Sequence, residues 1–164
     1  MRQLGIDASS TKAGLSVNID GKIETVEVIF YNDKSLYEKY VMLRDSITKL
    51  YITHRIETIV IEDFLKQKGG QTSAATLSKL AQMNGLIYGI LYILTTPEYV
   101  IAVHPSTARK KVIGKAFTST QKTKDMVADF VQNVLGIPVE RTKQDNLKKG
   151  EDDKCDAIIL SLYT

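Results

Sequence analysis

Four acidic side chains have a spacing that would suit one shared cation site: Asp7, Glu62, Asp153 and Asp156. Asp7 follows the first apolar segment, and Glu62 follows the apolar run that begins at Ile56. Asp153 and Asp156 are three residues apart, so a helix would present both on one face. If the first and fourth strands are neighbours, as we expect, the C-terminal helix can bring its two carboxylates to the same point.

Converging carboxylates indicate a metal site and hydrolytic chemistry. Carboxylates without intervening basic residues repel one another at neutral pH, and Mg²⁺ is a hard cation that prefers oxygen ligands. Two ions about 4 Å apart can activate water and stabilise the leaving oxygen of a phosphodiester. The simpler alternative for Asp7 is a turn residue, capped by the Ser-Ser-Thr hydroxyl groups that follow it.

Two of these assignments stay open at this point. Asp152 lies beside Asp153 and four residues before Asp156, so either residue could be the third ligand. Asp63 lies beside Glu62 in the same way. Because side chains alternate along a strand, only one of these two can point toward Asp7.

Basic residues are concentrated in the middle of the chain. The formal net charge is +3, but residues 64–124 contain nine Lys or Arg residues and one acid, which gives this segment +8. Residues 1–63 and 125–164 carry −2 and −3. This separation predicts a polyanionic partner, and an ordinary solvated basic face is the alternative.

Hydrophobic periodicity predicts the elements that position these side chains. The expected strands cover residues 3–8, 13–19, 22–31, 56–61 and 99–103. The expected helices cover residues 35–54, 73–96, 105–112, 119–135 and 152–162. This order predicts an α/β fold in which helices flank a central mixed five-stranded sheet, with Asp20 and Gly21 forming a hairpin turn.

The helix expected at 73–96 has two apolar stripes. One stripe contains Leu77, Leu80, Ile87, Leu91 and Leu94. The other stripe contains Met83, Leu86, Ile90 and Ile93. One stripe would cover the sheet, and the other indicates another helix or a subunit partner. Gly85 and Gly89 would allow close approach, and tight packing within one chain is the alternative.

Composition and length limit the class of protein. The 164 residues, 43% of them hydrophobic, suit one globular domain spanning 1–164. The longest apolar run, 86–94, is too short to cross a membrane, and we expect an intracellular, cytoplasmic protein. Cys155 is the only cysteine, and the sequence contains neither a zinc-binding His-Cys pattern nor a phosphate-binding GKS or GKT loop.

Four motifs resemble the RuvC-like Holliday junction resolvases of the RNase H superfamily, including their phage and poxvirus members. The motifs are LGIDASSTKAG around Asp7, IVIEDF around Glu62, the basic segment 105–124, and DDKCDAIILSL around Asp153 and Asp156. They occur in the family's order over nearly the whole chain. The turn after Asp7 reads Ala-Ser-Ser, where the family more often has Pro-Gly-Ser.

The resemblance implies an RNase H-like fold and a Mg²⁺-dependent endonuclease of DNA recombination and repair, with Mn²⁺ as a substitute. Two ions per subunit would be held by Asp7, Glu62, Asp153 and Asp156. Asp7 would bridge the ions, and Asp153 is preferred to Asp152 because it matches the family's D-x-x-D-A pattern. The enzyme would act as a homodimer, with the 73–96 helix as its interface, and would make paired nicks in four-way DNA junctions. The resemblance to phage members of the family is consistent with a phage-encoded protein that acts in a bacterial host.

The resemblance and the central positive charge together predict the DNA-binding residues. They are Phe64, Lys66, Lys68, Arg109, Lys110, Lys111, Lys115, Lys122 and Lys124. Lys122, preferred to Lys124, would act in catalysis at the scissile phosphate together with a residue of the 109–111 group. Phe64 resembles an aromatic that stacks on a junction base, but it lies one position closer to Glu62 than in the family pattern.

Other functions remain as alternatives. An RNA-processing nuclease of the same superfamily would use the same carboxylates, and a non-catalytic module would bind branched DNA through the basic segment alone. Phage relatives often accept a wider range of branched DNA, so forks and Y-structures join four-way junctions as expected substrates. The sugar kinase and actin superfamily begins with a similar strand, but it needs two such lobes.

Overall fold

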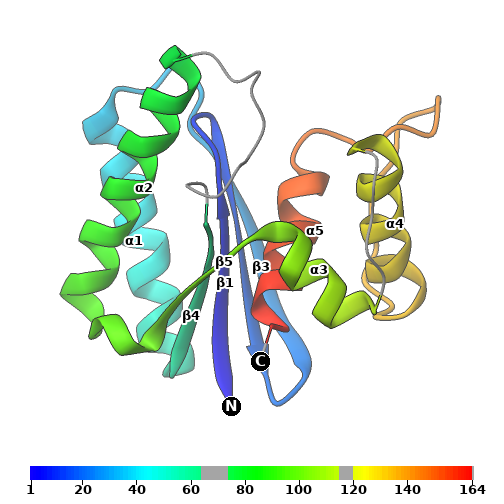
Figure 1. Cartoon of the computed structure of the whole chain (residues 1–164), viewed down its shortest axis with the longest axis horizontal. Coiled ribbons are helices and arrows are strands. Elements are labelled where there is room, and N and C mark those ends of the chain that lie inside the picture. The colour runs from blue at the N-terminus through cyan, green and yellow to red at the C-terminus, as the bar shows by residue number, and fades with distance from the viewer. Residues whose placement is uncertain (64–73, 115–119, 164) are drawn as a thin grey trace.

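The computed structural model describes residues 1–63, 74–114 and 120–163, and its central element is one mixed sheet (Figure 1). The strands are β1 (Arg2–Ala8), β2 (Lys12–Ile19), β3 (Lys22–Phe30), β4 (Thr58–Glu62) and β5 (Val100–Val103). Their order in the sheet is β3-β2-β1-β4-β5. β1 pairs antiparallel with β2 and parallel with β4, and β4 pairs parallel with β5. The predicted mixed five-stranded sheet, with the first and fourth strands adjacent, is confirmed.

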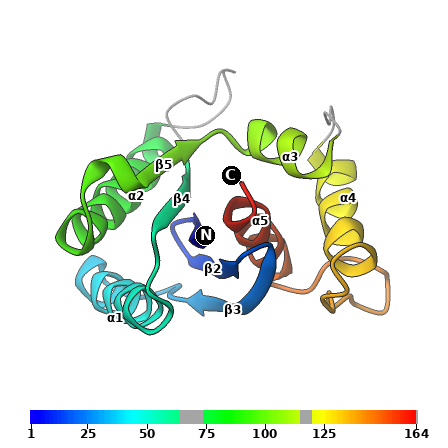
Figure 2. The same cartoon turned by 90° about the horizontal axis from the view of Figure 1, so that it is seen from below.

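Helices cover both faces of this sheet (Figure 2). They are α1 (Leu36–His54), α2 (Ala74–Leu94), α3 (Pro105–Ile113), α4 (Thr120–Asn133) and α5 (Glu151–Ser161). α1 and α2 lie on one face, whereas α5 lies on the other with α3 and α4 beyond it. Within the described residues, no helix is both long enough and apolar enough to cross a membrane.

Local signals in the sequence explain where several elements begin and turn. Asp20 and Gly21 both have positive φ, 51° and 87°, as the tight β2–β3 hairpin requires. Ser35 caps α1: its hydroxyl accepts from the Glu38 backbone N–H, and the Glu38 carboxylate accepts from the Ser35 backbone N–H. The predicted hairpin and the predicted start of α1 are confirmed.

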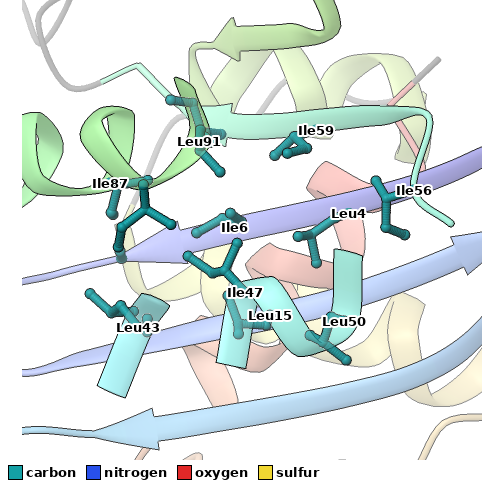
Figure 3. Close-up of a cluster of buried hydrophobic side chains, with 14 of the residues drawn as sticks. Leu4, Ile6, Leu15, Leu43, Ile47, Leu50, Ile56, Ile59, Ile87 and Leu91 are labelled. Atoms are coloured by element: carbon teal, nitrogen blue, oxygen red, sulfur yellow. The ribbon is translucent and has the colours of Figure 1, made fainter. Parts of the chain in front are cut away.

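The core between the sheet and α1 and α2 corrects the two-stripe prediction for the second helix. Leu4, Ile6 and Leu15 of the sheet pack against Ile47 of α1 and Ile87 of α2 (Figure 3). The buried face of α2 combines both predicted stripes, because Met83 and Ile90 are buried beside Ile87 and Leu91. Leu77 and Ile93 are instead 49% and 77% exposed. The face of α2 that covers the sheet therefore lies between the two predicted stripes.

Two glycines allow α5 to lie directly on the opposite face. A Cβ at Gly5 would lie 2.2 Å from the Ala157 carbonyl oxygen, and a Cβ at Gly14 would lie 2.2 Å from the Asp153 carbonyl oxygen. Both distances are far inside van der Waals contact, so any side chain at these positions would push the helix away. Gly14 is the register partner of Asp7, so this contact places the start of α5 beside Asp7.

Polar contacts fix the other end of α5. The Gln3 amide donates to the Tyr163 carbonyl (2.9 Å), the Asn18 amide donates to the Ser161 carbonyl (2.8 Å), and the Ser16 and Ser161 hydroxyls lie 3.0 Å apart. Since buried polar groups are costly unless they are paired, these contacts favour one register of α5 on β1 and β2.

Candidate active site

Asp7 and Glu62 lie side by side at the ends of two parallel strands. Ile6 pairs with Ile61 in the β1–β4 register, so the next residue of each strand is an acid. Ile6 and Ile61 belong to the core beneath α1 and α2. Because side chains alternate along a strand, Asp7 and Glu62 face α5. The structure therefore places Glu62, rather than Asp63, on the α5 side.

Asp7 is the electrostatic centre of the cluster. Burial raises the pKa of Asp7 well above its usual value, and the charges of Asp156, Glu62 and Asp153 raise it further. Burial also raises the pKa of Glu62, while a hydrogen bond with Asp7 lowers it. Burial and the neighbouring charges therefore favour the neutral form of Asp7, and the four predicted carboxylates lie close enough to influence one another's charge.

The first turn of α5 separates the roles of its two adjacent aspartates. Asp153 is 6% exposed, and burial followed by the neighbouring Asp152 raises its pKa to about 6. Asp152 receives hydrogen bonds from Lys12 (2.8 Å) and Lys124 (2.7 Å). Although burial raises the pKa of Asp152, hydrogen bonds with Asp153, Lys12 and Lys124 lower it overall. Asp153 is therefore the acid directed into the cluster, and Asp152 is directed to the lysines.

Basic side chains lie among the acids, contrary to the expectation of carboxylates without intervening bases. Arg109 of α3 donates to both oxygens of Asp156, with Nη2 2.9 Å from Oδ1 and 2.8 Å from Oδ2. Lys12 of β2 forms ion pairs with Asp152 and Asp153. Burial raises the pKa of Asp156, and the Arg109 charge opposes this shift. Arg109 and Lys12 therefore offset part of the negative charge of the cluster.

The donor set fits a hard divalent cation by its chemistry, although its present spacing is not that of a chelate. In the ranges 1–63, 74–114 and 120–163, no three acidic, His or Cys side chains are grouped closely enough to hold one ion. The acids nevertheless supply only oxygen ligands, and the buried Asp153 Oδ2 is paired with the Lys12 ammonium. Carboxylate oxygens are the ligands that Mg²⁺ and Mn²⁺ prefer.

The predicted DNA-binding residues fall into three groups. Lys110 and Lys111 are exposed on α3, and Lys111 lies 4.7 Å from the centre of the Tyr163 ring. Arg109 and Lys124 instead contact acids of the cluster. The predictions for Phe64, Lys66, Lys68 and Lys115 lie outside the described residues, and so does the side chain of Lys122, whose backbone is in α4.

Two further residues shape the site and were not predicted from the sequence: Lys12 and Tyr31. Lys12 is the first residue of β2, and a single lysine after a hydroxyl-rich turn gives no signal of contact with acids 140 positions away. Tyr31 is fully buried, and its hydroxyl lies 2.8 Å from the Ser9 carbonyl and 2.7 Å from the Lys12 carbonyl. In the sequence, the only sign of this role was that Tyr31 ends the strand expected at 22–31.

Residues 3–159 match the sequence profile of the family described as crossover junction endodeoxyribonuclease RuvC. The chain belongs to the RuvC family. Crossover junction endodeoxyribonuclease RuvC of Mycobacterium sp. (strain KMS) is 27% identical to it over 154 residues, which are 88% of this chain and 76% of that protein. The RuvC family match therefore includes all four acids of the cluster.

Solved RuvC structures share this fold. Thermus thermophilus RuvC in complex with a Holliday junction substrate superposes with a TM-score of 0.74 at 19% identity, over 99% of this chain and 92% of that one. The yeast mitochondrial Holliday junction resolvase superposes with a TM-score of 0.60 at 14% identity, over 98% and 76% of the two chains. The predicted RNase H-like fold is confirmed.

Proposed function

We propose that this chain is a structure-specific DNA endonuclease that resolves Holliday junctions by metal-dependent hydrolysis of phosphodiester bonds, giving paired nicks. The observation that carries the proposal is the position of Asp7, which lies within the RuvC family match and close enough to Asp156, Glu62 and Asp153 for their charges to raise its pKa. Residues 1–164 would act as one nuclease domain. Other branched DNA, such as forks, belongs to the same proposed substrate class.

The four acids Asp7, Glu62, Asp153 and Asp156 would hold the metal, which we propose to be two Mg²⁺ ions per subunit with Mn²⁺ as a substitute. Ions bound there supply activation of the attacking water and stabilisation of the leaving oxygen. Asp7, placed between Glu62 and the α5 acids, would contribute to both ions. The raised pKa of Asp7 opposes this role, since a carboxylate binds a cation in its ionised form.

The basic residues near the acids would hold the DNA backbone. Lys110 and Lys111 lie on α3 beside Arg109, so their helix lies at the edge of the acidic cluster. We propose that they contact phosphates on either side of the cut, and that Lys122 faces the scissile phosphate. Contacts of this kind give affinity that decreases with salt and depends little on sequence.

We also propose that the protein acts as a homodimer through α2. Tyr92 and Ile93 are exposed on this helix, and a Cβ at Gly85 or Gly89 would meet no atom within 4 Å among the described residues. A second copy could therefore approach this surface closely.

Sedimentation of wild type and Ile93→Glu tests the interface: the wild type should sediment as a dimer and the variant as a monomer. A monomeric wild type at micromolar concentration would contradict the proposal.

The deciding experiment compares cleavage of a labelled four-way junction with cleavage of linear duplex of the same sequence. Wild type and Asp7→Asn are each incubated with Mg²⁺ or with EDTA. Paired nicks that require Mg²⁺ and disappear in the variant, while junction binding persists, would support the proposal. Binding without cleavage in Mg²⁺ or Mn²⁺ would favour a non-catalytic module.

An RNA duplex and an RNA–DNA hybrid provide the remaining arms of that experiment. The resolvase proposal expects the DNA junction to be cut fastest. Preference for a substrate carrying 2′-hydroxyl groups would instead identify an RNA-processing nuclease.

A further inference from the structure

The turn that presents Lys12 is held from several directions. The Ser9 backbone N–H donates to the Lys12 carbonyl (2.9 Å), and the Lys12 N–H lies 3.3 Å from the Ser9 hydroxyl oxygen. The buried Tyr31 hydroxyl binds the carbonyls of both residues. The Lys39 ammonium donates to the Ser10 carbonyl at 2.6 Å. The backbone of Lys12 is therefore fixed at the start of β2, after the turn that follows Ala8.

The side chain of Lys12 spans two aspartates with different surroundings. Its ammonium lies 2.8 Å from Asp152 Oδ1 and also pairs with Asp153 Oδ2, and the side chain is only 18% exposed. Asp153 Oδ2 is buried, and the Lys12 ammonium is the cation paired with it. A buried carboxylate is costly unless it is paired, so Lys12 stabilises the ionised form of Asp153.

Asp152 differs because it has a second cation. Lys124 donates to Asp152 Oδ2 at 2.7 Å. The Lys12 ammonium can thus leave Asp153 and remain bonded to Asp152, a short movement that breaks one ion pair and keeps the other. The geometry gives Lys12 two partners, only one of which belongs to the proposed metal ligands.

We propose that Lys12 is a built-in competitor for the divalent cation: it holds Asp153 until a metal ion displaces it, and it thereby sets the metal concentration at which the site fills. This inference rests on the proposed metal role of Asp153. An ammonium and a divalent ion cannot share Asp153 Oδ2 without strong repulsion, so each lowers the affinity of the other. Lys12 is in this sense a positioning residue that acts through Asp153.

Titration calorimetry of the full chain with Mn²⁺, in the absence of DNA, tests the proposal directly. Lys12→Met removes the competing charge, and we expect Mn²⁺ to bind about tenfold more tightly than to wild type. The matched control is Lys49→Met, since Lys49 is an exposed lysine of α1 that pairs with Glu27 rather than with an acid of the cluster. This control should bind Mn²⁺ as wild type does.

A second variant protects the test against a failure to fold. Lys12→Gln removes the charge but keeps a hydrogen-bond donor, and it should also bind Mn²⁺ more tightly. Circular dichroism melting gives an independent readout: Mn²⁺ should raise the Tm of both variants more than that of wild type. Unchanged or weaker Mn²⁺ affinity in folded Lys12→Gln would overturn the proposal.

Asp7→Asn separates this inference from the proposed function. If Mn²⁺ binds Asp7→Asn as tightly as wild type, the metal site itself is misassigned, whatever the lysine variants show. If Asp7→Asn loses Mn²⁺ binding while Lys12→Met and Lys12→Gln match wild type, the metal site stands and the competition does not.

Discussion

Arg109 and Asp156 form a bidentate ion pair between α3 and α5, in which Nη2 lies 2.8 Å from Oδ2 and Nε lies 3.1 Å from Oδ1. Each side chain is only about one-fifth exposed, at 19% and 20%. The pair thus joins a helix from the basic segment to a helix that carries two of the acids.

Arg109→Met should destabilise the protein in EDTA by about 1–2 kcal/mol, because Asp156 would lose its charge-assisted hydrogen bonds. Addition of Mg²⁺ should recover part of this loss, since the ion can then neutralise Asp156. Urea unfolding in EDTA and in Mg²⁺ measures both effects. Lys110→Met, on the exposed side of the same helix, is the control and should unfold as wild type does.

Gly14→Ala should move α5 and abolish cleavage. The added Cβ would overlap the Asp153 carbonyl oxygen, and overpacking of this kind costs about 1–3 kcal/mol or more. The expected result is a lower Tm together with loss of junction cleavage. Thr53→Ala tests whether the effect is local, because Thr53 is exposed on α1 and alanine favours a helix. A Gly14→Ala enzyme with normal stability would contradict the close packing.

The stability of the protein in EDTA should fall as the pH rises from about 4 to 7. The pKa of Asp153 is raised to about 6, and burial also raises the pKa of Asp7, so the folded state binds more protons than the unfolded state in this window. Stability therefore decreases with pH while these groups lose their protons. Thermal melting at a series of pH values measures the slope, and Asp153→Asn should reduce it.

Saturating Mg²⁺ should reverse that pH dependence. A cation binds the ionised carboxylates, so stabilisation by metal increases as the protons leave. The same melting series with Mg²⁺ checks this result. A falling Tm in both EDTA and Mg²⁺ would argue against metal binding by these acids.

Tyr31→Phe should loosen the turn that carries Ser9 and Lys12. The variant loses the buried hydroxyl that binds two carbonyls, at a cost of about 1–2 kcal/mol. We expect a lower Tm and slower cleavage. Tyr37→Phe is the matched control, because Tyr37 is 74% exposed and its variant should match wild type in both measurements.

Lys110→Ala combined with Lys111→Ala should weaken junction binding and reduce its salt dependence. Each lost phosphate contact removes about one unit from the slope of log affinity against log salt. Binding measured over a range of salt concentrations should thus show a slope smaller by about two. Lys49→Ala removes an exposed lysine of α1, on the opposite face of the sheet, and should leave the slope unchanged.

Much of the fold could be predicted because its signals are local. Apolar alternation located β1, and the Asp20-Gly21 turn located the hairpin, since both depend on residues adjacent in sequence. The boundaries shifted by a few residues, as for β4, expected at 56–61 and observed at Thr58–Glu62. The division of α2 into two separate apolar stripes was wrong, because residues of both stripes share the buried face and the helical period alone does not show where one face ends.

The sequence by itself determined which acids are available and which elements carry them, because side-chain type and hydrophobic period are properties of short segments. Only the tertiary structure decided that Asp153 enters the cluster while Asp152 turns to Lys124, and that Lys12 and Arg109 lie among the acids. Those contacts depend on how closely α5 approaches β2 at Gly14 and on where α3 meets α5. They join residues tens to more than a hundred positions apart, and packing rather than local pattern brings such residues together.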